Sequence, residues 1–233
     1  IADAADANGC ERFILISTDK AVNPANILGA SKRVAEMYTE IINGSSHTKY
    51  MTVRFGNVLD SEGSVVPLFR DQIKKGGPIT VTHKDVTRYF MTIPEACQLI
   101  LQSCSMGNGG EIYVLDMGEP VKINFLAEQI IKLSGLKPNE DINIEYTGLR
   151  PGEKMYEELF YDSEKRENTK HKKIYIAKYP SLNVNEIKMQ IDSLVNACEN
   201  FDEEGMHLVL ESLVPYHKSV EDNVVPINKV KTS

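Results

Sequence analysis

The sequence contains no tryptophan, and aromatic residues make up only 7% of its 233 residues. It has few cysteines, and none of them lies at a CxxC or other metal-ligand spacing: Cys10, Cys97, Cys104 and Cys198. We therefore expect free, structural thiols in a reducing compartment and no metal site. No apolar run approaches the roughly 20 residues of a membrane-spanning helix, so we expect no membrane contact from this segment and no signal peptide.

The chain also lacks an excess of positive charge. It has 26 Lys and Arg residues against 33 Asp and Glu residues, which gives a net charge of -7. That balance argues against a general affinity for nucleic acid or for anionic membranes. Any site for a phosphorylated small molecule must be built from local basic residues. With 42% hydrophobic and 25% charged residues, the chain is in the globular range and can bury a substantial core.

A glycine-rich phosphate loop of the dinucleotide-binding type is missing as well. Such a loop follows a strand and opens a helix, whereas the GNGG run at 107–110 follows an expected helix and precedes a strand, so it is typical of a turn. The sequence begins at Ile1, inside an expected helix that Gly9 ends. We expect an N-terminally truncated fragment, with any pyrophosphate-binding half lying upstream.

The N-terminal pattern is that of an α/β protein. The apolar, β-branched run Arg12–Thr18 predicts a buried parallel strand, and Tyr50–Val58 predicts a second one. Between them, residues 30–42 form an amphipathic helix. Its apolar face consists of Val34, Met37, Tyr38 and Ile41, and its other faces carry Arg33, Glu36 and Glu40. Strand, helix and strand in this order form a right-handed parallel crossover.

Further elements follow Val58. The pattern predicts a helix, two short strands, another helix and a strand near 111–117. Helices then alternate with short strands, and two closing helices cover about 184–200 and 203–216 before a polar tail.

Polar residues stand where the first strand ends. In open α/β sheets, ligands bind beyond the carboxyl ends of the strands, which is where Ser17, Thr18 and Asp19 lie. Lys32 follows a Gly-Ala-Ser run that allows close approach of a ligand or backbone. Taken alone, Lys32 and the adjacent Asp19-Lys20 pair are typical of solvated surface charges. Their position at a strand end makes them candidates for a site.

The string STDKAVNPANILGASKRVAE (17–36) resembles the active-site segment of the extended short-chain dehydrogenase/reductase family. Three further strings follow in order: RFGNVLDSEGSVVPLF, VTHKDVTRYFMTIPEA and LRPGEKMYEEL. Together they resemble the CapD-like branch of nucleotide-sugar 4,6-dehydratases, which act on UDP-N-acetylglucosamine in bacterial polysaccharide and glycan biosynthesis. The resemblance extends from about residue 12 to 216.

The resemblance implies the organisation of the fold. We expect an α/β protein made of the C-terminal half of a Rossmann-type doubly wound parallel sheet and a smaller mixed α/β substrate-binding region. Residues 1–60 would be the C-terminal part of the NAD(P)-binding Rossmann domain and carry the active-site segment. Residues 61–233 would form the substrate-binding region with interleaved Rossmann elements, such as the strand near 111–117, and the C-terminal helices.

The resemblance also implies catalytic roles. Thr18 is the hydroxyl member of the catalytic set, Asp19 the acid that protonates the departing 6-hydroxyl, and Lys20 the base that removes the C5 proton. Such chemistry needs a neutral lysine and a protonated carboxyl, and desolvation in a closed site favours both forms. By the same resemblance Lys32 binds the nicotinamide ribose, and Ser17 contributes to cofactor binding.

Leu28 occupies the position at which the family carries a catalytic tyrosine, four residues before Lys32. In the large, membrane-anchored members of the branch this position is methionine, so an apolar residue there is compatible with activity. Leucine cannot accept the proton of the sugar 4-hydroxyl. Thr18, Asp19 or a water relayed through Lys32 would have to do so.

The remaining matches imply substrate contacts. Asn57 resembles the asparagine that hydrogen-bonds the diphosphate, and Arg88 and Arg150 resemble the diphosphate-binding arginines. The planar guanidinium suits bidentate contacts with phosphate. Glu153 would accept hydrogen bonds from the nucleotide ribose.

We therefore expect a nucleotide-sugar 4,6-dehydratase that uses NAD or NADP and takes a UDP-sugar as substrate. A UDP-sugar 4-epimerase and a non-catalytic sugar-nucleotide-binding fragment stay open as alternatives. We expect the isolated fragment to be inactive and the complete protein to be a homo-oligomer in the cytoplasm. Anchoring of the complete protein to the inner membrane through an upstream region is also open.

Overall fold

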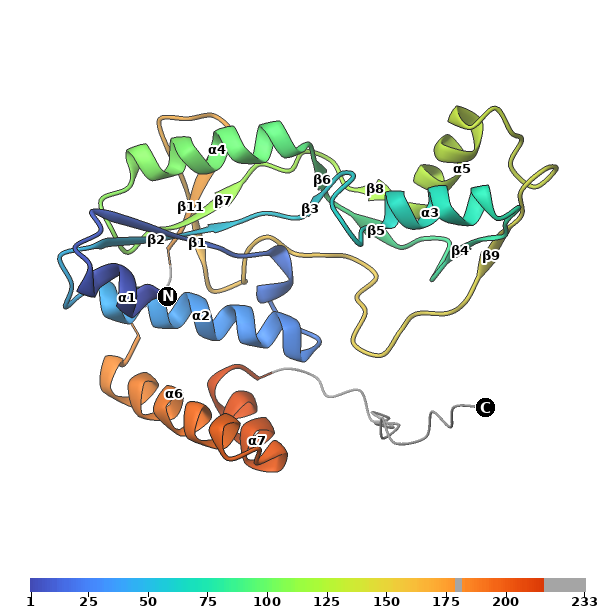
Figure 1. Ribbon diagram of the computed structural model, residues 1–233. Coiled ribbons are helices and arrows are strands. Elements are labelled where there is room, and N and C mark those ends of the chain that lie inside the picture. The colour runs from blue at the N-terminus through green and yellow to red at the C-terminus, as the bar shows by residue number, and fades with distance from the viewer. Residues whose placement is uncertain (179–181, 216–233) are drawn as a thin grey trace.

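The computed structural model describes residues 1–178 and 182–215 (Figure 1). The helices are α1 (Ala2–Ala7), α2 (Ile27–Asn43), α3 (Val65–Lys74), α4 (Ile93–Met106), α5 (Ile123–Leu133), α6 (Val184–Glu199) and α7 (Glu203–Leu213), with a 3-10 turn η1 (Asp19–Ala21). The strands are β1 (Arg12–Ile16), β2 (Lys49–Arg54), β3 (Asn57–Val58), β4 (Ile79–Val81), β5 (Thr87–Arg88), β6 (Phe90–Met91), β7 (Ile112–Leu115), β8 (Val121–Lys122), β9 (Ile144–Tyr146), β10 (Lys165–Asn168) and β11 (Ile174–Lys178). The predicted α/β class is confirmed.

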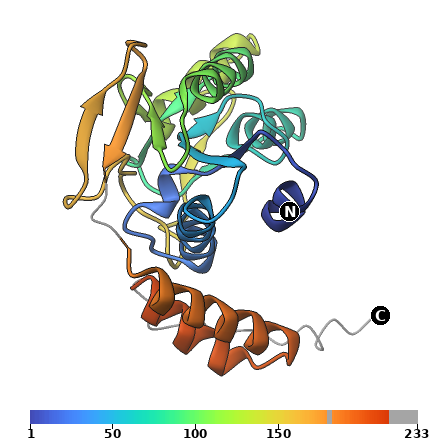
Figure 2. The same cartoon turned by 90° about the vertical axis from the view of Figure 1, so that its left-hand side faces the viewer.

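The main sheet has the strand order β1-β2-β7-β11-β10. β1, β2 and β7 are parallel, and β11 and β10 continue the sheet as an antiparallel hairpin. Helix α4 covers one face and α2 the other, with the α6–α7 pair packed on the outer side of α2 (Figures 1 and 2). Because both faces of the parallel strands are covered, their residues are apolar on both sides, as in the fully buried run Ile112–Leu115.

A second group of elements lies beyond the carboxyl ends of the parallel strands (Figure 1). It consists of α3, α5, the parallel pair β4–β9 and the antiparallel pair β5–β8. These elements enclose their own apolar core, in which Phe69, Ile79 and Ile131 are at most 1% exposed. Polar residues at the strand ends therefore face a second group of elements that has its own apolar core.

The strand predicted over Tyr50–Val58 is wrong as a single element. The structure ends β2 at Arg54, and β3 pairs instead with β6, outside the main sheet. Gly56 marks the break, because a Cβ there would lie 2.8 Å from the Cβ of Tyr89. Close contact with the β5–β6 segment thus draws the chain out of the sheet just where Asn57 follows.

Two residues of α2 were assigned to the wrong environment. Arg33 and Glu36, expected to face away from the core, are 3% and 0% exposed. Glu36 is paired with Arg33 and with Arg54 of β2, and Arg54 is also paired with Glu164. Because the charges compensate one another, charged residues can occupy a face that periodicity alone would assign to solvent.

Smaller differences concern the chain's C-terminal part and its thiols. Strand β10 was not expected from its charged sequence KREN, although such charge is typical of an edge strand. The last helix ends at Leu213, and Tyr216 and the polar tail lie outside the described residues. All the cysteines are free as predicted, but only Cys104 is partly buried. Within the described residues, no helix is long and apolar enough to cross a bilayer.

Candidate active site

The end of β1 places three predicted residues against the neighbouring strand. Beyond Ile16, the backbone N–H of Ser17 still donates to the Val53 carbonyl at 2.8 Å, and that of Asp19 donates to the Phe55 carbonyl at 3.1 Å. The chain then turns into η1, whose N-cap Thr18 accepts a bond from the Lys20 N–H at 3.4 Å. This turn brings the side chains of Asp19 and Lys20 together, with Lys20 against Asn57.

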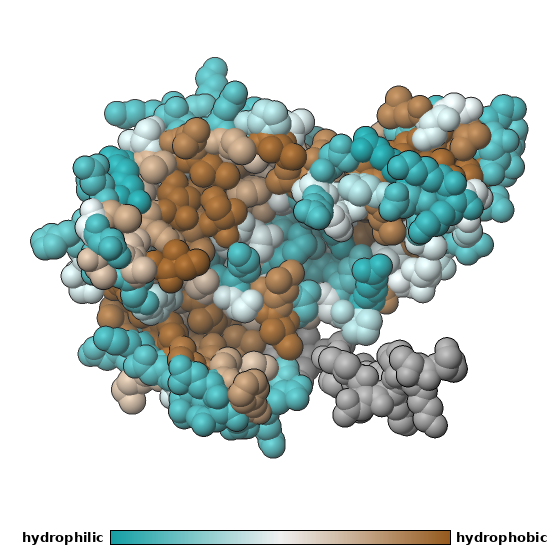
Figure 3. Space-filling view, viewed as in Figure 1, coloured by the Kyte–Doolittle hydropathy of each residue, from teal (hydrophilic) through white to brown (hydrophobic). Residues whose placement is uncertain are grey.

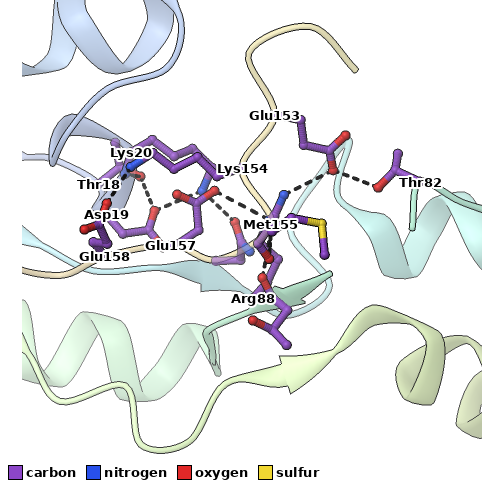
Figure 4. Close-up of polar contacts among 12 residues, drawn as sticks. Thr18, Asp19, Lys20, Thr82, Arg88, Glu153, Lys154, Met155, Glu157 and Glu158 are labelled. Atoms are coloured by element: carbon purple, nitrogen blue, oxygen red, sulfur yellow. Dashed lines mark hydrogen bonds and ion pairs between the residues drawn. The ribbon is translucent and has the colours of Figure 1, made fainter. Parts of the chain in front are cut away.

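Asp19 and Lys20 form the centre of the site. The Lys20 Nζ lies 2.9 Å from Asp19 Oδ1 and donates to Asn57 Oδ1 at 3.1 Å. The Thr18 hydroxyl donates to the same Asp19 Oδ1 at 2.9 Å. Thr18, Asp19, Lys20 and Asn57, predicted from two distant strings, are thus joined in one hydrogen-bonded group. Figure 4 shows the first three of them close together.

The Asp19 carboxyl is fully buried, whereas the Lys20 side chain is 28% exposed. Asp19 Oδ2 has no hydrogen-bond partner among the described residues, and a Cβ on Gly56 would lie 3.0 Å from it. Thr18 and Lys20, both bonded to Oδ1, connect the buried carboxyl to the open part of the site.

The start of α2 positions Leu28 and Lys32. Asn26 caps the helix by accepting the Gly29 N–H at 3.0 Å. Leu28, in the first turn, is 59% exposed and lines the cleft described below. The Lys32 Nζ donates to the Ile16 carbonyl at 3.3 Å, so its ammonium lies at the carboxyl end of β1.

Ser17 has a different environment from the other predicted residues. It is 4% exposed, and its hydroxyl donates to Glu36 Oε1 at 2.6 Å. Burial of Glu36 raises its pKa, but the charges of Arg54 and Arg33 outweigh this effect, so the pKa is lowered overall. Ser17 therefore connects the end of β1 to the buried charge network.

Arg88, Arg150 and Glu153 meet on the other side of the site. Arg88 Nη2 donates to Glu153 Oε1 at 3.1 Å, and the Thr82 hydroxyl donates to the same oxygen at 2.9 Å. The backbone N–H of Arg150 donates to Glu153 Oε2 at 3.1 Å. Arg150 itself is exposed, which leaves its guanidinium accessible from the cleft.

The RPGE turn is fastened to the start of α2. The Asn26 amide donates to the Gly152 carbonyl at 3.0 Å, and Lys154 Nζ donates to the Val22 carbonyl at 2.9 Å. Gly152 has a φ of 70°, and a Cβ there would lie 2.7 Å from the Ala25 carbonyl oxygen. Only glycine fits both conditions, so the Arg150 turn is held beside the active-site segment.

Two adjoining cavities open between these groups. One has a volume of about 600 Å³ and the other of about 220 Å³, and Lys20, Arg88, Arg150 and Glu153 line both. Asn57 and Leu28 line the larger one. Figure 3 shows the corresponding surface as a hydrophilic hollow between the main sheet and the α3 region. Two arginines, a lysine and an amide thus face a space of small-molecule size.

One residue of this site was missed. Glu157 lines the smaller cavity, with Oε1 3.5 Å from Arg88 Nε and a side chain that is 5% exposed. Burial raises its pKa. It belongs to the LRPGEKMYEEL string, but that string has several glutamates, and only the folded loop separates buried Glu157 from Glu158, which is 46% exposed.

Comparison with known proteins identifies the family. Residues 1–179 match the family described as polysaccharide biosynthesis protein. The chain belongs to this family. It is 51% identical over 207 residues to the capsular polysaccharide biosynthesis protein CapD of Staphylococcus aureus, covering 88% of this chain and 34% of CapD. It is 57% identical over 178 residues to the probable polysaccharide biosynthesis protein EpsC of Bacillus subtilis, covering 76% of this chain and 30% of EpsC.

Solved structures agree with this assignment. The X-ray structure of Pen from Bacillus thuringiensis has a TM-score of 0.69 and 37% identity, over 77% of this chain and 56% of Pen. Structures of UDP-sugar 4-epimerases and dTDP-glucose 4,6-dehydratases at 18 to 20% identity share the fold. The family member described here is thus a CapD-like protein with the Rossmann fold of extended short-chain dehydrogenases/reductases. It spans about a third of the length of CapD and EpsC.

Proposed function

We propose that the protein carrying this chain is a nucleotide-sugar 4,6-dehydratase that converts UDP-N-acetylglucosamine into a UDP-4-keto-6-deoxy sugar. The observation that supports this most strongly is the Asp19–Lys20 pair, bonded at 2.9 Å and placed between Asn57 and Thr18. Elimination of water across C5 and C6 needs one group that removes a proton and one that donates a proton. A bonded lysine and carboxylate can supply both.

The pair begins and ends the elimination in defined protonation states. The cycle starts with Lys20 as a neutral amine and Asp19 as a carboxylate, and the proton that the 4-hydroxyl releases during oxidation at C4 converts Asp19 into a carboxylic acid. The amine then removes the C5 proton, and the acid protonates the departing 6-hydroxyl, which leaves as water. In this conformation that second proton travels from Asp19 through Thr18 or Lys20, because the Asp19 carboxyl is itself buried.

A nicotinamide cofactor, NAD or NADP, would supply the acceptor for the C4 hydride and return that hydride to C6. The residues present fit the nicotinamide end of such a cofactor. Lys32 holds its ammonium at the carboxyl end of β1, 3.3 Å from the Ile16 carbonyl, where it can donate to ribose hydroxyls. Leu28 presents an exposed apolar surface nearby and offers no proton acceptor. We assign acceptance of the 4-hydroxyl proton to Thr18, which can pass it to Asp19 Oδ1.

The arginines would bind the diphosphate. Arg88 and Arg150 line the same two cavities although they lie far apart in the sequence, and Asn57 adds an amide at the Lys20 side. A diphosphate entering this space would replace the carboxylate of Glu153 as the partner of Arg88. Glu153 would then be free to accept bonds from the nucleotide ribose.

An epimerase is the second candidate, because UDP-glucose 4-epimerases of Rickettsia species are 35 or 36% identical to this chain. An epimerase needs a group that manages the 4-hydroxyl proton and needs no acid–base pair at C5 and C6. Leu28 in place of the tyrosine and the bonded Asp19–Lys20 pair favour the dehydratase.

The proposal is tested with the full-length protein and UDP-N-acetylglucosamine, followed by mass spectrometry and NMR of the sugar nucleotide. A product lighter by one water, with a 4-keto group and a 6-methyl group, is the expected result. A product of unchanged mass with inverted C4 would support the epimerase. An unaltered sugar nucleotide that still binds would support the non-catalytic alternative.

A further inference from the structure

The hydroxyl of Tyr161 contacts the turn that carries the Asp19–Lys20 pair. Tyr161 follows the LRPGEKMYEEL string, 140 residues along the chain from Ala21, and its hydroxyl donates to the Ala21 carbonyl at 2.6 Å. Ala21 is the last residue of η1 and is fully buried. A carbonyl at the end of a helical turn has no partner within the turn. The tyrosine hydroxyl supplies that partner.

The peptide group between Ala21 and Val22 connects Tyr161 to Asp19. Its carbonyl accepts the bond from Tyr161, and its N–H, which belongs to Val22, donates to the Asp19 carbonyl at 3.0 Å. The carbonyl of Val22 accepts a further bond from Lys154 Nζ at 2.9 Å. Hydrogen bonds in such a chain polarise one another and become stronger. Two side chains from the loop between β9 and β10 thus hold the segment whose N–H binds the backbone of Asp19.

The ring of Tyr161 is held by the buried charge network. Its centroid lies 5.5 Å from Cζ of Arg33 and 5.7 Å from Cζ of Arg54, distances at which a guanidinium is attracted to an aromatic ring. The backbone N–H of Tyr161 donates to Glu164 Oε2 at 3.0 Å, and Glu164 is itself bonded to Arg54. These contacts need only the ring and the backbone, whereas the bond to η1 needs the hydroxyl.

The η1 turn depends on such outside support because one of its own bonds is long. The Lys20 N–H lies 3.4 Å from the Thr18 hydroxyl oxygen, which is beyond the usual range for an N–H donor. The Lys20 Nζ has to stay 2.9 Å from Asp19 Oδ1 and 3.1 Å from Asn57 Oδ1. A displacement of about 1 Å in a reacting group can lower a rate by about 10²-fold. A small shift of η1 would therefore slow the chemistry of the pair.

We infer that Tyr161, together with Lys154, is a positioning residue that holds the Asp19–Lys20 pair in the geometry for elimination across C5 and C6. Tyr161 acts through the end of η1 and lines neither of the two cavities. This inference rests on the proposed function. Loss of the hydroxyl should slow the step at C5 and C6 and leave the binding of the UDP-sugar unchanged.

The test compares Tyr161→Phe with Tyr156→Phe in the full-length protein with its nicotinamide cofactor. Each variant loses one hydroxyl from the same loop, and Tyr156 is 62% exposed. After mixing with UDP-N-acetylglucosamine, stopped-flow absorbance follows the formation of reduced nicotinamide, which reports oxidation at C4. The later loss of that absorbance reports the return of the hydride after elimination. Calorimetric titration with UDP gives the Kd for the nucleotide.

We expect Tyr161→Phe to form reduced nicotinamide at a rate within about twofold of wild type and to lose it about tenfold more slowly. The Kd for UDP should be unchanged, and Tyr156→Phe should match wild type in all three measurements. Both rates are first-order constants that do not depend on the fraction of folded protein. A variant that is only less stable would therefore leave both of them unchanged.

Equal slowing of formation and loss in Tyr161→Phe, or an unchanged rate of loss, would overturn the inference. A weaker Kd for UDP, or the same slowing in Tyr156→Phe, would overturn it as well. If Tyr161→Phe does not fold, Lys154→Met decides, because it removes the other bond to this segment: slower loss with unchanged formation supports positioning, and any other pattern contradicts it. Failure of the wild-type protein to release water from the substrate would overturn the proposed function itself, and is a separate result.

Discussion

Replacement of Glu36 by glutamine should destabilise the protein strongly. The Glu36 carboxylate accepts two bonds from Arg54, both at 2.7 Å, one from Arg33 at 2.9 Å and one from Ser17 at 2.6 Å. Glu36 and Arg54 are fully buried. Glutamine would place an amide donor against guanidinium donors and take from Arg54 the carboxylate of Glu36, leaving its ion pair with Glu164.

The magnitude follows from what remains after the change. Removing one partner of a buried ion pair costs about 3–5 kcal/mol, because the other charge stays buried without compensation. Arg54 keeps its bonds of 2.7 and 2.8 Å to Glu164. We therefore expect the lower end of that range, about 3 kcal/mol of the free energy of unfolding. A loss of this size lowers Tm by about 6 °C or more in a domain of 150–250 residues.

Glu40 provides a matched control one helical turn later. Burial raises its pKa, and its Oε2 has no hydrogen-bond partner among the described residues. Glu40→Gln removes a charge that the folded state disfavours, so its Tm should be unchanged or higher. Thermal unfolding of the full-length wild type and both variants at neutral pH gives the comparison. Equal Tm losses in the two variants would refute the argument that Glu36 compensates buried positive charge. A loss of less than about 1 kcal/mol in the free energy of unfolding of Glu36→Gln would refute it as well.

The pH dependence should differ in sign between the two residues. The pKa of Glu36 is lowered in the folded state, so its contribution to stability is complete above the unfolded value of about 4.3 and is lost as the pH falls through the lowered value. The pKa of Glu40 is raised. The contribution of Glu40 to stability is complete below a pH of about 4.3 and is lost as the pH rises through the raised pKa. The Tm advantage of wild type over Glu36→Gln should therefore shrink on acidification.

Three further substitutions test the site itself. Lys20→Ala should reduce turnover by about 10²–10⁴-fold and abolish deuterium exchange at C5. Reduced cofactor should still form when this variant is mixed with substrate. Full activity of the variant would remove Lys20 from the mechanism. Gly56→Ala should lower the free energy of unfolding by about 1–3 kcal/mol and should also lower kcat, because the new Cβ would lie 2.8 Å from Tyr89 Cβ and 3.0 Å from Asp19 Oδ2. An unaltered kcat would contradict this close packing. Arg88→Lys should raise KM for the UDP-sugar about tenfold, because lysine cannot make the bidentate contact, and a greater effect on kcat than on KM would argue against diphosphate binding.

Much of the arrangement could be predicted from sequence because the relevant signals are local. The apolar run that became β1 and the polar residues after it placed Thr18 and Asp19 at a strand's carboxyl end, and the structure has them there. The periodicity of 30–42 predicted α2, with its start missed by a few residues because the Asn26 cap precedes the apolar pattern.

The features that the sequence did not predict depend on contacts between segments that are distant in the sequence. Glu36 can be buried because Arg54 of β2 pairs with it, and Arg54 is itself paired with Glu164. The hydrophobic periodicity of α2 contains no signal of these contacts. The strand break at Gly56 depends on the approach of Tyr89. Glu157 and Glu158 are adjacent glutamates that no sequence pattern tells apart. The fold of their loop buries Glu157 and leaves Glu158 exposed.

The most direct test of the proposed dehydratase follows the hydride. Full-length protein is incubated with UDP-N-acetylglucosamine carrying deuterium at C4, and the product is examined by NMR. Our account predicts deuterium in the 6-methyl group, because the hydride removed from C4 returns to C6 after water has left. Deuterium that remains at C4, with or without inversion of that carbon, would contradict it.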